Sequence, residues 1–320
     1  MTDRPRVDVH TTTISNSADE VYRRLESVGQ WSQMFEPTIH STELAREGNK
    51  QTIQLWAVAN GEPKSWVSER HLDPVARTIR FAQTITAPPV AEMSGEWKVL
   101  PLTEDSCSVR LTHTYRAEAD SEEALAWIAK AVDTNSTKEL AALKAALERD
   151  ADSELSAFTF ADSVETTADP VLLFSFLDRG ELWSGRLDHV VEAEMKEFSD
   201  GLQLLRMRTR TPDGDSHVTE SYRVSQSPAR LLYKQVTLPA LLELHTGEWT
   251  ISPSGESWKV TSKHTVAINP EAVQKVLGPD ATVVDAKELA RRNLGNNSLR
   301  TLEAAVRWAD AAAPQRRAGT

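Results

Sequence analysis

Apolar and polar residues alternate in several short stretches of this chain, and a period of two is typical of strands with one buried face. Two such stretches span residues 7–14 and 158–166. After the first, Ser17 and Glu20 have the S-x-x-E spacing of a capping box, which predicts that a short helix begins there. Further alternating stretches follow and predict a series of antiparallel strands in each part of the chain.

The two series of strands end near residues 108–116 and 258–268, and each is followed by a long segment with helical spacing, about 121–147 and 282–309. One face of the first long segment is apolar and consists of Leu125, Ile128, Val132, Leu140, Leu143 and Leu147. Because a sheet and an amphipathic helix must each cover an apolar surface, we expect the helix to lie across a curved sheet. Such an arrangement leaves room for a ligand pocket between them.

The two halves of the chain repeat one another. Four short sequences return in the same order 151 to 153 residues later: Asn60-Gly61 as Asp213-Gly214, VSE at 67–69 as VTE at 218–220, SGEW at 94–97 as TGEW at 246–249, and His113-Thr114 as His264-Thr265. This agreement predicts a tandem duplication. The helical pattern stops and charge accumulates near residues 149–155, so we predict two α+β domains, residues 1–149 and 150–320.

Composition narrows the classes of partner. Of the 320 residues 40% are hydrophobic, enough for two buried cores, and the net charge of -11 disfavours a nucleic acid as partner. No apolar run reaches the roughly 20 residues of a membrane-spanning helix, and the first residues lack the apolar region of a signal peptide. We therefore expect a cytoplasmic protein with no membrane or nucleic-acid partner.

The stretch WVSER combines an aromatic, a hydroxyl and a guanidinium on one strand face. With a period of two, Trp66, Ser68 and Arg70 point the same way. If this face lines the pocket, the three side chains suit an oxygen-rich organic ligand. Arg70 could instead reach the sheet edge or pair with Glu69 or Asp73.

Three further residues belong to the same candidate site. In AEMSGEWKV the charged residues alternate with Met93 and Trp97, which are therefore expected to face inward. Asn135 lies in line with Ile128 and Val132 on the buried helix face, where an amide needs a partner from the protein, water or a ligand. Large aromatic residues are commonly core residues, so only the combined pattern indicates a site.

No cofactor motif accompanies these residues. The eight histidines show no H-x-x-x-H spacing with a third ligand nearby, and the sequence has no Gly-rich phosphate loop, nucleophile elbow or dinucleotide motif. We therefore expect a site without a metal and without a cofactor.

The ordered set of Trp31, W-x-S-x-R, M-x-x-x-W and Asn135 resembles the bacterial polyketide aromatase/cyclases, helix-grip proteins related to the START and Bet v 1 folds. The duplication resembles their di-domain subclass over essentially the whole chain. The resemblance implies that the substrate is a linear poly-β-ketone delivered by an acyl carrier protein. It also implies transient contact with the carrier protein and the minimal polyketide synthase. The expected reaction is formation of a first aromatic ring of the C7-C12 type. Single-domain relatives often carry a tyrosine shortly after the first tryptophan, where this chain has Phe35.

Each residue type suits an intramolecular aldol reaction. Rigid apolar walls that limit the foldings of a flexible chain are expected from Trp31, Trp66, Met93 and Trp97. Arg70 would stabilise developing oxyanions, Ser68 would position a carbonyl or relay a proton, and Asn135 would orient a carbonyl. The main alternative is a carrier or sensor of hydrophobic ligands, for which the cationic Arg70 has little use.

The second copy is expected to hold a different pocket. By the offset of the repeats, its pocket keeps two tryptophans and gains two histidines: Trp183, Trp249, His217 and His245. Thr219 takes the place of Ser68 and Ser221 that of Arg70, so we expect the arginine to be lost. We predict that the first copy closes the ring, and that the second either assists dehydration or is a structural scaffold.

One basic stripe lies outside these pockets. Arg206, Arg208 and Arg210 alternate with the apolar Leu205 and Met207, so the arginines are expected on the solvent face. A minority alternative is that this stripe docks an acidic carrier protein.

Overall fold

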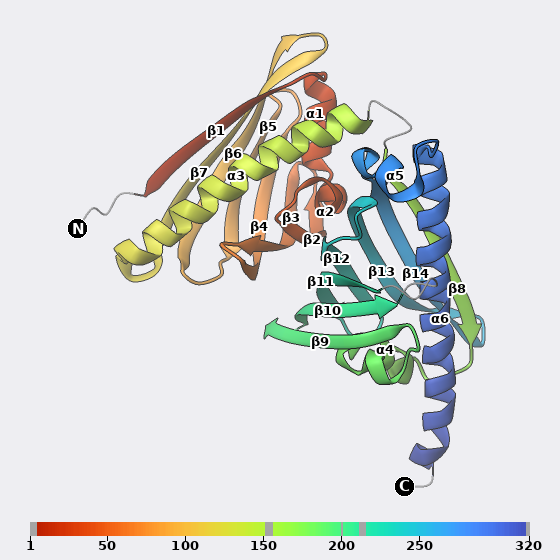
Figure 1. The fold of residues 1–320 in the computed structure, drawn as a ribbon. Helices are drawn as coiled ribbons and strands as arrows, with labels where there is room; N and C mark the ends of the chain where they lie inside the picture. Colours follow the sequence, from red (N-terminus) through yellow and green to blue (C-terminus); the bar gives the residue numbers. More distant parts are fainter. Residues whose placement is uncertain (1–4, 151–155, 200, 211–215, 318–320) are drawn as a thin grey trace. The chain divides into compact units, whose positions relative to one another are not determined.

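The computed structural model describes residues 5–150, 156–199, 201–210 and 216–317 (Figure 1). The chain divides into two compact units, Met1–Asp152 and Ser153–Thr320. The predicted boundary at 149–155 falls mostly outside the described residues, and so does the predicted Asp213-Gly214 turn. In the described part of the chain, no helix is long and apolar enough to cross a membrane.

The first unit is one antiparallel sheet of seven strands in the order β1-β7-β6-β5-β4-β3-β2. Its strands are β1 (Arg6–Ile14), β2 (Thr38–Glu47), β3 (Lys50–Ala59), β4 (Glu62–Asp73), β5 (Thr78–Ile85), β6 (Val90–Thr103) and β7 (Ser106–Ala117). Its helices are α1 (Ala18–Glu26), α2 (Trp31–Met34) and α3 (Glu122–Asp150), with short 3-10 turns at Val28–Gln30 and Glu118–Asp120. The long helix α3 lies across the sheet (Figure 1).

The second unit repeats this plan with the strand order β8-β14-β13-β12-β11-β10-β9. Its strands are β8 (Phe158–Thr166), β9 (Val190–Ser199), β10 (Leu202–Arg210), β11 (Ser216–Gln226), β12 (Arg230–Thr237), β13 (Leu242–Ser254) and β14 (Ser257–Ile268). Its helices are α4 (Pro170–Asp178), α5 (Pro270–Leu277) and α6 (Val283–Arg317), with a 3-10 turn at Gly180–Gly185. Two copies with the same topology confirm the predicted α+β fold and its duplication.

Local sequence signals explain several element boundaries. The Ser17 side chain accepts a hydrogen bond from the Glu20 amide and caps α1, as the S-x-x-E spacing predicts. Asn60 and Gly61 join β3 to β4 with positive φ angles of 51° and 83°, the geometry that favours these residues in two-residue hairpins. The short helix α5 was not predicted, although Asn269 caps it and a proline fills its first turn.

Two apolar clusters hold α3 against the sheet. The larger one joins α1, the sheet and the second half of α3, and it includes the fully buried Ile14, Leu25, Leu111 and Leu143. The smaller cluster lies under the first half of α3 around Ile128. Because the two clusters are separate, side chains between them are left to line a pocket.

The repeated SGEW and TGEW sequences have a packing reason. A Cβ on Gly95 would clash with the carbonyl oxygen of Thr112 and with the ring of Phe81. In the second unit, a Cβ on Gly247 would clash with the ring and hydroxyl of Tyr233 and with a backbone carbonyl oxygen. The glycine therefore makes room for an aromatic side chain from the neighbouring strand, and both of these aromatic side chains border a pocket.

Candidate active site

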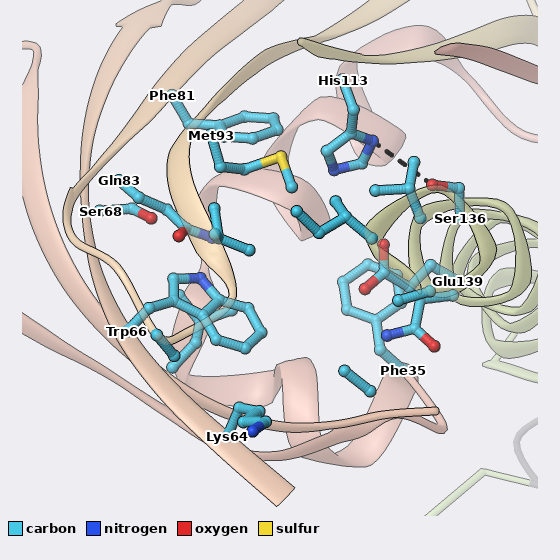
Figure 2. A pocket seen from close by; sticks show the side chains of 18 of the residues that line it. Phe35, Lys64, Trp66, Ser68, Phe81, Gln83, Met93, His113, Ser136 and Glu139 are labelled. Atoms are coloured by element: carbon cyan, nitrogen blue, oxygen red, sulfur yellow. Dashed lines mark hydrogen bonds between the residues drawn. The ribbon is translucent and has the colours of Figure 1, made fainter. Parts of the chain in front are cut away.

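The first unit holds a pocket between its sheet and α3 of about 1050 Å³, including the space open to solvent. All seven residues that the sequence singles out in this copy border the pocket: Trp31, Trp66, Ser68, Arg70, Met93, Trp97 and Asn135. The predicted inner faces of β4 and β6 are therefore the ones that face the pocket. Figure 2 shows Trp66 and Met93 reaching into this space from the sheet.

Arg70 lies at the junction of β4 with α1 and has only 1% of its surface exposed. Its guanidinium donates hydrogen bonds to the carbonyl oxygens of Leu25 (2.6 Å) and Glu26 (3.2 Å) and to Oε1 of Gln51 (2.6 Å). The guanidinium carbon lies 5.0 Å from the ring centroid of Trp31. A cation thus meets the last turn of α1, where carbonyl groups lack backbone partners.

The hydrogen-bond partners of Arg70 among the described residues are all neutral, and the carboxylates of Glu26 and Glu43 act on its charge without being hydrogen-bonded to it. Glu69, which the sequence offers as a partner, instead pairs with Lys50 at 2.7 Å. Burial lowers the pKa of Arg70 to about 10, so the guanidinium stays protonated at neutral pH. The pocket therefore borders a buried positive charge, and the guanidinium has more N–H groups than these three bonds use.

Aromatic rings form the walls beside Arg70. Phe35 meets Trp31 edge-on with the ring centroids 5.3 Å apart, and it stacks on Trp97 at 6.1 Å. Trp66 from β4 and Trp127 from α3 complete the apolar lining, and Trp127 was not predicted. Ser68, one strand period before Arg70, is 3% exposed and lies on the same inner face.

Two polar residues reach the pocket from α3. The amide nitrogen of Asn135 donates to the carbonyl oxygen of Val58 at 3.0 Å, so the partner that the sequence requires is the sheet backbone. Glu139, one turn further along α3, was not predicted, although its spacing from Asn135 places it on the same helix face. Burial raises the pKa of Glu139 to about 8, and Figure 2 shows its carboxyl group turned towards the pocket. At neutral pH this group is a neutral acid.

His113 also borders the first pocket, and the sequence marks it only as part of a repeat. Its Nδ1 lies 3.4 Å from the hydroxyl of Ser136 on α3 (Figure 2). Burial lowers the pKa of His113 to about 4, so the imidazole is neutral at physiological pH. Other lining residues that were not predicted are Lys64, Phe81 and Gln83.

The second unit holds its own pocket of about 830 Å³, again including space open to solvent. All four residues predicted for this copy border it: Trp183, His217, His245 and Trp249. The counterpart of Asn135 is Asn297 on α6, because it borders this pocket next to Ser298 as Asn135 does next to Ser136. Among the described residues, no three His, Cys, Asp or Glu side chains come together as a metal-binding group.

The predicted loss of the arginine from the second copy is wrong. Arg223 borders the second pocket and donates a hydrogen bond to the carbonyl oxygen of Leu177 at the end of α4, at 2.6 Å. Its guanidinium carbon lies 5.6 Å from the ring centroid of Trp183. It pairs across the sheet with Gln203, as Arg70 pairs with Gln51. Burial lowers the pKa of Arg223 to about 10, so this charge is also retained.

The error arose from a slip of two residues along β11. In the sheet, Trp66 and Ser68 lie opposite Leu55 and Ile53, and the corresponding strand pairs of the second unit contain Thr219 and Ser221. Ser221 therefore matches Ser68 rather than Arg70, and His217 matches Lys64 rather than Trp66. A shift of two residues keeps every side chain on its original face, so the alternation in the sequence could not reveal it.

The comparisons with known proteins agree with this arrangement. A family model described as polyketide cyclase/dehydrase and lipid transport matches residues 6–148. The granaticin polyketide synthase bifunctional cyclase/dehydratase of Streptomyces violaceoruber is 38% identical over 304 residues, which is 95% of this chain and 94% of that one. The actinorhodin polyketide synthase bifunctional cyclase/dehydratase of Streptomyces coelicolor is 39% identical over 308 residues, 93% of this chain and 95% of that one.

Two solved structures match both units together. The di-domain aromatase/cyclase BexL from the BE-7585A biosynthetic pathway is 45% identical with a TM-score of 0.86, covering 95% of this chain and 98% of that one. StfQ, the di-domain aromatase/cyclase from the steffimycin pathway, is 28% identical with a TM-score of 0.85, covering 96% and 99%. The chain belongs to the polyketide cyclase/dehydratase family, as a tandem helix-grip member of the di-domain type.

Proposed function

We propose that this protein binds a poly-β-ketone chain carried by an acyl carrier protein, closes its first six-membered ring in the C7-C12 pattern and aromatises it in the cytoplasm. The relatives named cyclase/dehydratase align with both units of the chain, which supports an enzyme rather than a carrier of apolar ligands. The observation that carries the proposal is the buried guanidinium of Arg70 in an aromatic pocket, hydrogen-bonded to neutral groups, because a carrier of apolar ligands gains nothing from such a charge.

Ring closure is assigned to the first pocket because of its walls. A flexible polyketone can fold in many ways, and most of the rate of an intramolecular aldol comes from holding one carbon against one carbonyl. Four tryptophans border the first pocket, Trp31, Trp66, Trp97 and Trp127. Two tryptophans border the second, which is also smaller.

The polar groups of the first pocket suit the charge changes of the aldol reaction. One α-carbon loses a proton to the neutral imidazole of His113, the resulting enolate attacks a ketone carbon, and the new alkoxide takes up a proton. Arg70 supplies a fixed positive charge towards the enolate and alkoxide oxygens in a dry site. Glu139, neutral at pH 7, supplies the proton to the alkoxide, while Ser68 and Asn135 orient carbonyl groups.

Contact with the carrier protein is part of the proposal, but the basic stripe is not its best candidate surface. Arg206, Arg208 and Arg210 are exposed, which confirms the predicted solvent face. Arg206 lies 3.6 Å from Glu220 and Arg208 lies 3.0 Å from Glu192, so part of the stripe's charge is already neutralised.

The test is a product profile of a reconstituted minimal polyketide synthase, with and without the wild-type protein, for C9-reduced and unreduced chains. We expect scrambled shunt products to be replaced by one first-ring aromatic with at least one of the two chains. A matched control is Arg206→Gln, which removes an exposed arginine on β10 that borders neither pocket. An unchanged profile with both chains would refute the proposed function and favour a carrier.

A further inference from the structure

The second pocket contains a cluster of three polar side chains that ring closure does not use. The hydroxyl of Tyr233 on β12 lies 2.7 Å from Nδ1 of His264 on β14 and 3.2 Å from Nε2 of His245 on β13. These two nitrogens lie 2.9 Å from each other. Each group is therefore within hydrogen-bond distance of the other two, and all three border the pocket.

Partners at both ends of the cluster determine where its protons lie. Nδ1 of His245 faces Oε1 of Gln235 at 2.8 Å, so this nitrogen donates and Nε2 of the same ring accepts. Nδ1 of His264 donates to the hydroxyl oxygen of Tyr233 at 2.7 Å, its shorter contact, and Nε2 of His264 accepts from the hydroxyl of Ser298 at 2.6 Å. Three of the four ring nitrogens are then satisfied without the proton of Tyr233, so this O–H is available to a ligand and the lone pair on Nε2 of His245 is free to take up a proton.

Burial keeps both imidazoles neutral and the phenol protonated. It lowers the pKa of His264 to about 4 and that of His245 well below its usual value, so both rings are neutral at pH 7. It raises the pKa of Tyr233, so the phenol keeps its proton. Asp162 and Arg291 also act on His264, but they pair with each other at 2.8 Å and their effects oppose.

The fold does not require this cluster, because the first unit has the same backbone without it. Phe81 pairs with Gly95 as Tyr233 pairs with Gly247, so the place of the tyrosine is taken by a phenylalanine. Met93, directly before SGEW, holds the place of His245. His113 matches His264, and its Nδ1 lies 3.4 Å from the hydroxyl of Ser136, while the ring beside it is Phe81 rather than a tyrosine. The polar cluster is thus specific to the second pocket.

We propose that Tyr233, His245 and His264 form a second catalytic centre, which eliminates water from ring-closed β-hydroxy ketones. Nε2 of the neutral His245 imidazole takes the proton from the carbon beside the ketone, and the C–H electrons form the new double bond. The C–O bond to the β-hydroxyl breaks, and this hydroxyl leaves as water with the proton of Tyr233. Nε2 of His245 then returns this proton to the phenolate, which lies 3.2 Å away, so the cluster is restored without an oxidant or reductant.

Arg223 adds a charge to the same pocket. Elimination beside a ketone places negative charge on the ketone oxygen, and a guanidinium on the pocket wall favours that charge. The proposal rests on the proposed function, since a β-hydroxy ketone ring is what aldol closure produces. It assigns the two steps of aromatisation to different pockets of one chain.

The test uses the full-length protein and a soluble cyclic β-hydroxy ketone, with growth of conjugated-enone absorbance as the readout. We expect Tyr233→Phe to lower kcat for elimination by about 100-fold, a typical loss for a positioned acid or base. We expect a similar loss for His245→Met, which copies the residue of the first pocket. Tyr222→Phe is the matched control, because Tyr222 is a buried tyrosine on the neighbouring strand β11, outside the pocket lining.

A second readout separates this proposal from the proposed function. In the reconstituted synthase, Tyr233→Phe should accumulate a ring-closed product that is heavier than the wild-type product by one water. Tyr233→Phe and His245→Met proteins that melt like the wild type and still eliminate at its rate would overturn the second centre while leaving ring closure intact. A wild-type protein that eliminates water from the soluble ketone but leaves the synthase profile unchanged would refute the proposed function alone.

Discussion

The two pockets share the residues that join the sheet to the first helix of each unit and differ in the residues that face the ligand space. Arg70 and Arg223 both donate to a carbonyl oxygen in the last turn of that helix at 2.6 Å. In contrast, Phe81 is replaced by Tyr233. The two copies thus share the arginine that binds the end of the first helix and differ in the side chains that line the pocket. The arginine therefore does not by itself decide which reaction a pocket performs.

The lining of the first pocket is richer in aromatic walls, and that of the second is richer in groups that can exchange protons. The first pocket has more tryptophans and one neutral carboxyl group, Glu139, whereas the second has four histidines, two of them within hydrogen-bond distance of a tyrosine. Apolar walls suit the folding of a long chain, and a linked acid and base suit the loss of water. Changes in the first pocket should therefore affect ring closure, and changes in the second should affect the loss of water.

The largest effect is expected where the two units are alike. Gly95→Ala and Gly247→Ala should each lower the free energy of unfolding by about 3 kcal/mol, the upper part of the usual range for overpacking, because a backbone carbonyl oxygen cannot move aside easily. Urea unfolding measures the change. Gly29→Ala is the control, since nothing lies within 4 Å of its Cβ position. Alanine variants as stable as the wild type would show that the aromatic rings do not need these glycines.

A smaller effect should follow from making the first pocket resemble the second at one wall. Trp66→Thr introduces the residue that Thr219 supplies in the second unit and should lower the yield of correctly closed ring by about tenfold, because the chain gains alternative foldings. Product analysis by mass spectrometry gives the ratio of first-ring aromatic to shunt products. An unchanged ratio would show that the wall formed by Trp66 does not direct the folding of the chain.

The pH dependence of ring closure should follow the ionisation of the Glu139 carboxyl group. Because burial raises its pKa to about 8, the acid form is present below that pH, and the rate should fall about tenfold per unit above it. Glu139→Gln should abolish this alkaline limb. The same variant should gain stability relative to the wild type as pH rises from about 4.5 to about 8, since only the carboxyl group is penalised for ionising in its buried site. A limb that persists in Glu139→Gln would exclude this residue as the acid.

The smallest effect is expected on the surface of the second unit. Arg208→Gln breaks an exposed pair with Glu192 and should change the free energy of unfolding by less than about 0.5 kcal/mol, with no change in products. Thermal melting and the same product analysis measure both. A clear loss of activity only with carrier-bound substrate would instead identify the basic stripe as a docking surface.

How much the sequence could predict depended on which physical signal each feature leaves. Period-two alternation, the capping box at Ser17 and the hairpin at Asn60 act locally, and they predicted strands, helix starts and the inner face of β4 correctly. The role of Arg223 was missed because a two-residue slip leaves alternation unchanged. Glu139 and Tyr233 look ordinary in sequence, and only the packing of the helix and strands around them brings out their chemistry.

The most direct test of the division of labour compares Arg70→Gln with Arg223→Gln in the reconstituted synthase. Both arginines hold the end of the first helix of their unit, and glutamine can still donate a hydrogen bond there, so structural damage is matched and melting curves verify it. We expect Arg70→Gln to return scrambled shunt products, whereas Arg223→Gln should still yield a closed first ring and lose water more slowly. Loss of ring closure in Arg223→Gln with normal closure in Arg70→Gln would refute this division of labour.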